Sequence, residues 1–169
     1  MTKPLASGAA TVACSMNTTT APFLPPEKLE TDLARVRTYW EGLKRGDATM
    51  PFSDDINPST LPDLSGRLML IGVFDRPLRF RLDMVGQDIR ERLGRDVVGK
   101  FLDEIDAPAP LQYLNSQASA AVESRAPTYY RHGSRQERGS RGADGYSRLV
   151  LPMWGDGRIA MLLGAITWS

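Results

Sequence analysis

The sequence predicts an α+β fold built on one five-stranded antiparallel sheet, with helices on one of its faces. Two strand-like runs, at 67–74 and 79–85, precede a helical middle, and three more follow it at 127–132, 145–154 and 158–168. Tight turns at 75–77 and 155–157 join neighbouring runs, which is typical of antiparallel strands. A chain of 169 residues suits one domain with a core and is too short for two ordinary ones. We expect a leader at 1–25, an amphipathic helix at 26–46 and one domain at 47–169.

The leader carries Lys3 as its only charge and is rich in Ala, Ser and Thr, which predicts a disordered tail. Its apolar run, Ala9–Cys14, is too short for a secretory signal, and no stretch approaches the roughly 18–20 apolar residues of a membrane span. Met16 is an alternative initiator, in which case Cys14 would be absent from the natural protein. We expect a cytoplasmic protein with no membrane partner.

The segment 26–46 has the clearest helical pattern in the chain. Pro26 suits a first helical turn, and Gly46 follows the basic pair Lys44 and Arg45 at the end. The apolar residues form one narrow stripe: Leu29, Leu33, Val36, Trp40 and Leu43. Such a stripe packs either on the chain's own sheet or on a second copy of itself. The second alternative makes these five residues a predicted homodimer interface.

The run 79–85 alternates in a way that predicts one buried and one wet face. Its apolar positions are Phe80, Leu82 and Met84, and its polar positions are Arg79, Arg81 and Asp83. Behind it, 86–93 and 97–105 each span about two helical turns, and a longer helix runs from Pro108 or Pro110 to about Arg125. We expect Gly86, Gly94 and Gly99 to set the ends of short helices that wall a cavity over the sheet.

The residues just described carry a resemblance to the PAS family. Gly86–Lys100 is similar to the connector between the first hairpin and the long helix of PAS domains, and Leu151–Pro152, Gly155–Arg158 and Leu163–Gly164 resemble their final hairpin. WEGLKRG, PFSDDINPSTLPDL, RFRLDMVGQDI, GRDVVGKFLDEI and LVLPMWGDGR more narrowly resemble a group of short bacterial PAS-like proteins. The resemblance covers about Trp40 to the C-terminus. It implies a PAS-like sheet with a cavity beneath the connector helices.

Fold pattern and resemblance together nominate a ligand pocket between the sheet and the helices. Its predicted members are Phe80, Leu82, Met84, Leu93, Phe101, Leu114, Ala118, Leu149, Leu151 and Met153. Position by position, a filled hydrophobic core is the favoured interpretation of each of these residues. The sequence does not distinguish a core from a cavity.

Composition disfavours several other functions. A net charge of +1 gives no electrostatic case for nucleic acid, and a single histidine and a single cysteine give none for a metal site. We expect no catalytic residues, because His132 has no G-x-S-x-G nucleophile to serve. The connector holds no cysteine, which excludes a flavin adduct of the family's photosensors, and haem ligation by His132 is disfavoured. Any other cofactor is unknown.

The arginines at 131, 135, 138, 141 and 148 belong to a Gly- and Ser-rich stretch, which predicts a solvated loop in preference to an anion site. The chain ends at Ser169 without the Asp-containing exit motif of many PAS sensors. We therefore expect a single-domain sensory or regulatory protein that binds a small molecule or a protein partner and signals in trans. The alternative is a ligand-free interaction or dimerisation module.

Overall fold

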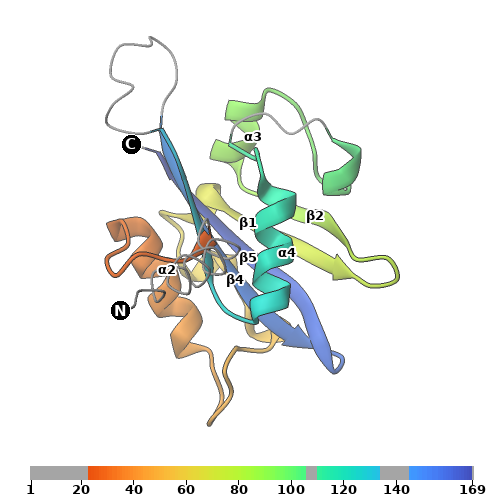
Figure 1. The fold of residues 1–169 in the computed structure, drawn as a ribbon. Helices are drawn as coiled ribbons and strands as arrows, with labels where there is room; N and C mark the ends of the chain where they lie inside the picture. Colours follow the sequence, from red (N-terminus) through yellow and green to blue (C-terminus); the bar gives the residue numbers. More distant parts are fainter. Residues whose placement is uncertain (1–22, 106–109, 134–144, 169) are drawn as a thin grey trace, which may run out of the picture.

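The computed structural model describes residues 23–105, 110–133 and 145–168. Its helices are α2 (Thr31–Gly42), α3 (Gln87–Leu93) and α4 (Leu114–Ser124), and its strands are β1 (Leu68–Phe74), β2 (Arg79–Val85), β3 (Thr128–His132), β4 (Tyr146–Gly155) and β5 (Arg158–Trp168). Four single 3-10 turns, η2 (Ser53–Asp55), η3 (Pro58–Thr60), η4 (Ser65–Arg67) and η5 (Leu102–Glu104), complete the order (Figure 1). The predicted fold class is confirmed.

The five strands form one sheet in the order β2-β1-β5-β4-β3, and every neighbouring pair is antiparallel. The longest strands, β4 and β5, lie in the interior, joined by a tight turn in which Asp156 and Gly157 both have positive φ, 51° and 78°. That geometry belongs to the two-residue hairpin turns that suit twisted strands. The sheet's edges are β2 and β3.

Both faces of the sheet are covered, and Figure 1 shows α2 on one side and α3 and α4 on the other. The side chain of Arg148 on β4 hydrogen-bonds to Gln117 of α4, whereas its neighbour Ser147 hydrogen-bonds to Glu30 at the start of α2. Neighbouring strand residues point to opposite faces, so these two contacts identify the faces. We call them the connector face, toward α4, and the α2 face. The expectation of helices on one face holds for α3 and α4.

Burial on both faces explains why β4 lacks alternation. Its first eight residues are all buried, so a polar face is absent from this strand, and only the edge strand β2 alternates between buried and half-exposed positions. The predicted boundaries of β2 and β5 are confirmed, and those of β1, β3 and β4 are correct to within one residue.

The helices are shorter than the sequence predicted. α2 begins at Thr31 and not at Pro26, and it ends at Gly42. α4 begins only at Leu114, after Tyr113 with a φ of 62°. The predicted helix at 97–105 is wrong, because only Leu102–Glu104 makes a helical turn.

Residues 99 and 100 instead lie along the outer edge of β2. The amide of Gly99 donates a hydrogen bond to the carbonyl of Leu82 at 2.7 Å, and the amide of Leu82 donates to Lys100 at 2.9 Å. Gly99 has a φ of 85°, which L-residues with a side chain rarely adopt. The glycine therefore lets the connector pair with the edge strand where a helix was expected.

The two ends of α3 confirm that glycines set its boundaries, for different reasons. Gly94 has a φ of 71° and caps the helix, with its amide donating to Arg90 at 3.0 Å. Gly86 has an ordinary φ of −63°, but a Cβ there would lie 2.3 Å from the carbonyl oxygen of Gly66. Gly86 is thus required by close backbone packing between the start of α3 and the segment before β1.

Candidate functional site

The structure divides the ten predicted pocket residues between the two faces of the sheet. Cross-strand partners share a face, and Leu82 lies level with Ile71, Leu162 and Pro152 on the connector face. Phe80, Leu82, Leu114 and Ala118 belong to that side, with Leu93 and Phe101 in the connector itself. Leu149, Leu151 and Met153 alternate with Arg148 and so lie on the α2 face, together with Met84. The ten residues therefore do not meet in one place.

Met84 changes face because of an irregularity in the β1–β2 pairing. The register shifts between Leu70 and Ile71, whose partners are Met84 and Leu82, so Asp83 is an extra residue on β2. Met84 is half-buried, whereas Phe80, Leu82, Leu114 and Ala118 are 1% exposed or less. The ten residues are absent from the linings of the cavities described below. Ligand binding at them stays a prediction.

The connector face holds a buried arginine at the end of the sheet where β4 begins. Arg148 is 0% exposed, and its Nε donates to Gln117 Oε1 at 2.6 Å. Its Nη1 and Nη2 donate to the carbonyls of Pro110 and Gln112 at 2.7 and 2.9 Å. Gln117 also donates to the backbone carbonyl of Arg148 at 3.2 Å, so this one amide holds the arginine at both ends. Arg148 thus ties the segment before α4 to the sheet.

Aromatic rings surround this guanidinium. The Arg148 guanidinium lies 5.0 Å from the ring centroid of Tyr130, its partner on β3. Tyr146 stacks with His132 at 5.3 Å and lies 6.1 Å from Tyr130, and Tyr113 lies 5.8 Å from Tyr130. Register explains the cluster, because Tyr130 pairs with Arg148 and His132 pairs with Tyr146. We call Arg148, Gln117, Tyr113, Tyr130, His132 and Tyr146 the arginine–tyrosine cluster.

The electrostatics of the cluster are unusual for a protein interior. Burial lowers the pKa of Arg148 to about 10, although the nearby tyrosines counteract part of the effect. No carboxylate in the described part of the chain pairs with it. Burial raises the pKa of Tyr146, and the adjacent Arg148 guanidinium counteracts part of this effect. The Tyr146 hydroxyl is buried, and its O–H donates no hydrogen bond within the described ranges. The cluster therefore combines a cation without a carboxylate partner and a phenol with a free O–H donor.

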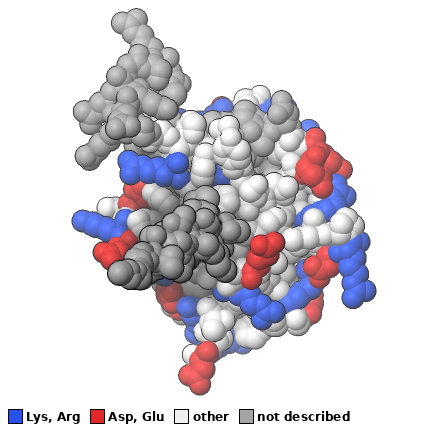
Figure 2. Space-filling model, in the orientation of Figure 1, with Lys and Arg blue, Asp and Glu red and all other residues white. Residues whose placement is uncertain are grey.

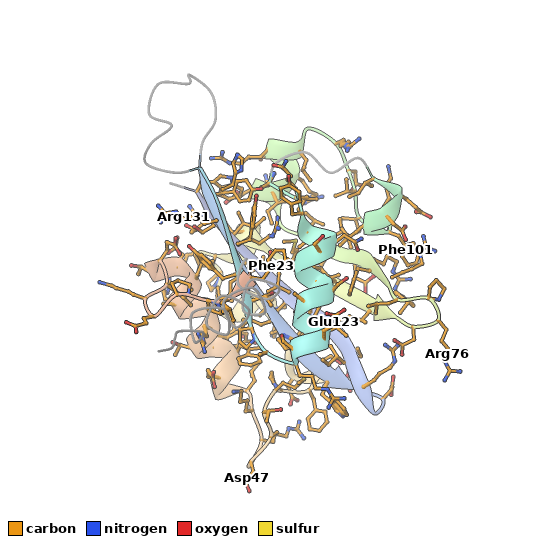
Figure 3. The ribbon with its side chains drawn as sticks, viewed as in Figure 1. Phe23, Asp47, Arg76, Phe101, Glu123 and Arg131 are labelled. Carbon is orange, nitrogen blue, oxygen red and sulfur yellow. The ribbon has the colours of Figure 1, made fainter. Side chains whose placement is uncertain are left out.

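The sequence interpretation of Arg148 as part of a solvated loop is wrong. Arg148 lies inside β4, in the series Tyr146, Arg148 and Val150 on the connector face. The other arginines of that stretch from 135 to 141 lie outside the described residues, and Arg131 is an exposed residue of β3. Figure 3 shows Arg131 at the margin of the sheet. The signal for Arg148 was its apolar surroundings, LVLPMW, which predict a buried strand.

The α2 face carries a second polar group, opposite the cluster on the same two strands. The hydroxyls of Tyr129 and Ser147 donate to Oε1 of Glu30 at 2.7 and 2.6 Å. Burial pulls the pKa of Glu30 upward, but hydrogen bonds from Ser147 and Tyr129 outweigh it, so the pKa lies below its ordinary value. Glu30 is the residue preceding α2. We call Glu30, Tyr129 and Ser147 the α2 latch.

Further contacts hold α2 along its length. Asp32 accepts a hydrogen bond from Arg67 at 2.6 Å and one from Thr167 on β5 at 3.4 Å. The indole Nε1 of Trp40 donates to the carbonyl of Pro152 on β4 at 2.9 Å. The helix therefore binds the sheet at both ends.

The apolar stripe of α2 faces this sheet in the single chain. Leu33, Val36 and Trp40 are each 1% exposed, and Leu29 and Leu43 are half-buried. A second copy is not needed to explain the burial of the first three. Homodimerisation stays a prediction. Because Leu33, Val36 and Trp40 are already buried within one chain, they are not available as its contact surface.

Three surface cavities lie away from the predicted pocket. Two run along the outside of α2, with volumes of about 730 and 330 Å³, and share Glu27, Leu29, Ala34 and Thr38. The third, of about 690 Å³, lies between Phe23–Pro25, the start of β3 and the outer side of α4. Phe23 borders it, 6.4 Å from the ring of Tyr130, and Figure 3 shows Phe23 close to α4.

The described residues contain no group of three or more His, Cys, Asp or Glu side chains placed to hold a metal ion. Nor does that part of the chain contain a helix long and apolar enough to cross a bilayer. Figure 2 shows acidic and basic side chains interspersed over the visible face.

The sheet order, the connector along the β2 edge and the helix α4 over the connector face define a small α+β domain. A family model described as a PAS domain matches residues 30–167, which is nearly the whole chain, and the protein belongs to this family. No curated protein and no solved structure matches it. PAS domains are typically sensory or interaction modules and not enzymes.

Proposed function

We propose that this PAS domain is a regulatory module. Binding on the connector face changes how α2 packs on the opposite face, and the changed packing of α2 alters the interaction with a partner protein in trans. The input is a small molecule or a protein that contacts the arginine–tyrosine cluster. The observation that carries the proposal is the placement of the cluster and the α2 latch on the same two strands.

The two groups alternate residue by residue. On β3, Tyr130 belongs to the cluster and Tyr129 to the latch; on β4, Arg148 belongs to the cluster and Ser147 to the latch. A change in the twist or position of a strand moves both of its faces together. Any ligand that shifts Tyr130 or Arg148 therefore changes the geometry of the two hydroxyls that bind Glu30.

The energy required is within reach of a ligand. Each hydrogen bond to the Glu30 carboxylate contributes about 1.5–3 kcal/mol when charge-assisted, and less where water replaces it. A ligand with an affinity difference of a few kcal/mol between two packings of α2 would shift the population from one to the other. The buried residues Leu33 and Val36 keep the docked state as the resting state.

Amide hydrogen exchange of Glu30→Ala tests the proposal, with Glu27→Ala, an exposed residue outside the helix, as the matched control. We expect faster exchange in α2 for Glu30→Ala while the amides of β4 and β5 keep their wild-type rates. The control should match the wild type. If exchange in α2 and in the central strands rises together, α2 is part of one cooperative core and the regulatory proposal fails.

The second candidate is an interaction or dimerisation module without a ligand, favoured by the cavities along the outside of α2. Their shared floor contains Ala34 and Thr38, small residues that allow close approach of a second helix. Ala34→Glu should then convert a homodimer or heterocomplex into folded monomer in light scattering. A wild-type protein that is already monomeric and captures no partner through this surface contradicts this candidate.

A further inference from the structure

The guanidinium of Arg148 has binding capacity that the described residues do not use. A guanidinium has five N–H donors, and the hydrogen bonds to Gln117, Pro110 and Gln112 use one each from Nε, Nη1 and Nη2. The Tyr146 hydroxyl also lies against this guanidinium and interacts with it, which leaves at least one Nη donor for a ligand. A charged N–H donor of this kind binds one oxygen of a carboxylate.

Tyr146 supplies a second unused donor. The residue is 2% exposed, and its O–H donates no hydrogen bond in the part of the chain that the structure describes. Burying a hydroxyl donor without an acceptor is unfavourable, so such groups in folded proteins ordinarily meet a ligand, an ion or a water. Tyr146 and Arg148 occupy alternate positions of β4 and project from the same face.

The walls of the cluster select the rest of the ligand. The ring of Tyr130 lies beside the arginine, and the rings of Tyr113 and His132 contact Tyr130 and Tyr146 in turn. Tyr113 is 57% exposed, so the side of the cluster on which Tyr113 lies faces solvent. Flat rings bind planar groups by stacking. Arg148 is the only formally charged side chain among the six residues of the cluster, and one positive charge matches one negative charge better than the two of a phosphate.

We propose that the arginine–tyrosine cluster binds a small aromatic carboxylate, with the carboxylate on Arg148 and Tyr146 and the ring among Tyr113, Tyr130 and His132. This inference rests on the proposed function, because it names the chemical class of the input. A bound carboxylate would neutralise the buried guanidinium and satisfy the Tyr146 hydroxyl.

Isothermal titration of the full chain with benzoate tests the proposal, with benzamide and inorganic phosphate as comparison ligands. We expect saturable 1:1 binding of benzoate and binding of benzamide at least about tenfold weaker, because the amide lacks the charge. Absence of saturable benzoate binding, equal binding of benzamide, or binding of phosphate in its place would each overturn the proposal.

Tyr146→Phe gives the sharpest variant, since it removes only the unpartnered hydroxyl and keeps the ring. It should fold at least as stably as the wild type and bind benzoate about tenfold more weakly. Tyr39→Phe is the matched control, because the Tyr39 hydroxyl contacts the backbone of Asn57, beside α2. Unchanged benzoate affinity in Tyr146→Phe would show that the carboxylate does not bind the Tyr146 hydroxyl and would overturn the proposed site.

The failure of this inference and of the proposed function are distinguishable. Benzoate binding that leaves exchange of the α2 amides unchanged supports the ligand site and contradicts the regulatory role of α2. Faster exchange in Glu30→Ala without any benzoate binding supports the regulatory role and contradicts the ligand class.

Discussion

The hydroxyl of Tyr129 donates a hydrogen bond to the carboxylate of Glu30 at 2.7 Å, although 99 positions separate the two residues in the sequence. Ser147 joins the same carboxylate oxygen and lies 3.1 Å from the Tyr129 hydroxyl. The three side chains connect the start of α2 to an edge strand and its neighbour. The other carboxylate oxygen of Glu30 is buried without a partner in the described residues. The two hydroxyls, a backbone hydrogen bond at Glu30 and the charge of Arg131 therefore stabilise the carboxylate together.

The latch predicts a specific acid sensitivity. The pKa of Glu30 is below its ordinary value of 4.5 in the folded chain, so its contribution to stability is fully present above pH 4.5 and is lost as the pH falls through the lower, folded pKa. Thermal unfolding should therefore show a steeper loss of stability below pH 4.5 in the wild type than in Glu30→Gln. Parallel pH profiles for the two proteins would contradict the prediction.

Trp40→Phe tests the other end of α2. The change removes the hydrogen bond to the Pro152 carbonyl and leaves space for part of the indole ring, so we expect a loss of about 2–3 kcal/mol in the free energy of unfolding. Urea denaturation measures this loss. Tyr39→Phe serves as the control on the same helix and should cost about 1 kcal/mol or less. A loss in Trp40→Phe no larger than in the control would mean that α2 does not depend on this contact.

Leu33→Asp combined with Val36→Asp distinguishes a core helix from a dimer interface. Because both side chains are 1% exposed against the chain's own sheet, we expect the double variant to lose its cooperative unfolding transition or to fold with α2 detached. Circular dichroism and light scattering report on both. A double variant that is a folded monomer with α2 still protected, derived from a dimeric wild type, would instead establish the intermolecular interface.

Three glycine-to-alanine changes should differ in sign and size. Gly86→Ala forces a Cβ into the Gly66 carbonyl and should cost about 2–3 kcal/mol, whereas Gly94→Ala meets open space but must adopt a φ of 71°, which costs about 1–2 kcal/mol. Gly42→Ala, exposed in the last turn of α2 with ordinary φ and nothing within 4 Å, should stabilise the chain by about 0.5 kcal/mol. Chemical denaturation measures all three. A neutral Gly86→Ala would contradict the packing described for the start of α3.

The strands were predicted well from the sequence, because alternation in an edge strand and the residue types of a tight turn can be recognised from neighbouring residues alone. Arg79–Val85 alternates visibly since β2 is an edge strand with one covered face, and Asp156 and Gly157 are typical of a tight hairpin. The connector was mispredicted at 97–105 because the pairing of Gly99 with Leu82 is a tertiary contact that helical periodicity does not reveal. The start of α2 was mispredicted for the same reason. The helix begins after Glu30, whose hydrogen-bond partners Tyr129 and Ser147 are distant in the sequence.

The candidate site was harder to predict, because alternation along a strand does not show which set of side chains points to the connector face and which to the α2 face. Only the tertiary contacts of the strand decide this. In β4 both faces are buried, so Leu149, Leu151 and Met153 look the same in sequence as residues of the connector face. Met84 was displaced by the extra residue Asp83, which no local motif announces. Arg148 was grouped with nearby arginines because charge ordinarily indicates exposure, and only the register with Tyr130 and the position of Gln117 account for its burial.

The position of α2 against β4 and β5 has a consequence for how the chain is made. Its sheet partners Ser147, Pro152 and Thr167 follow their α2 contacts by 117, 112 and 135 positions. A ribosome adding about 5–20 residues each second would therefore expose the apolar side of this helix for several seconds before its partners emerge. Contacts so distant in sequence also make folding slow, because a long loop must close before they form. During synthesis, the helix is a natural target for chaperones.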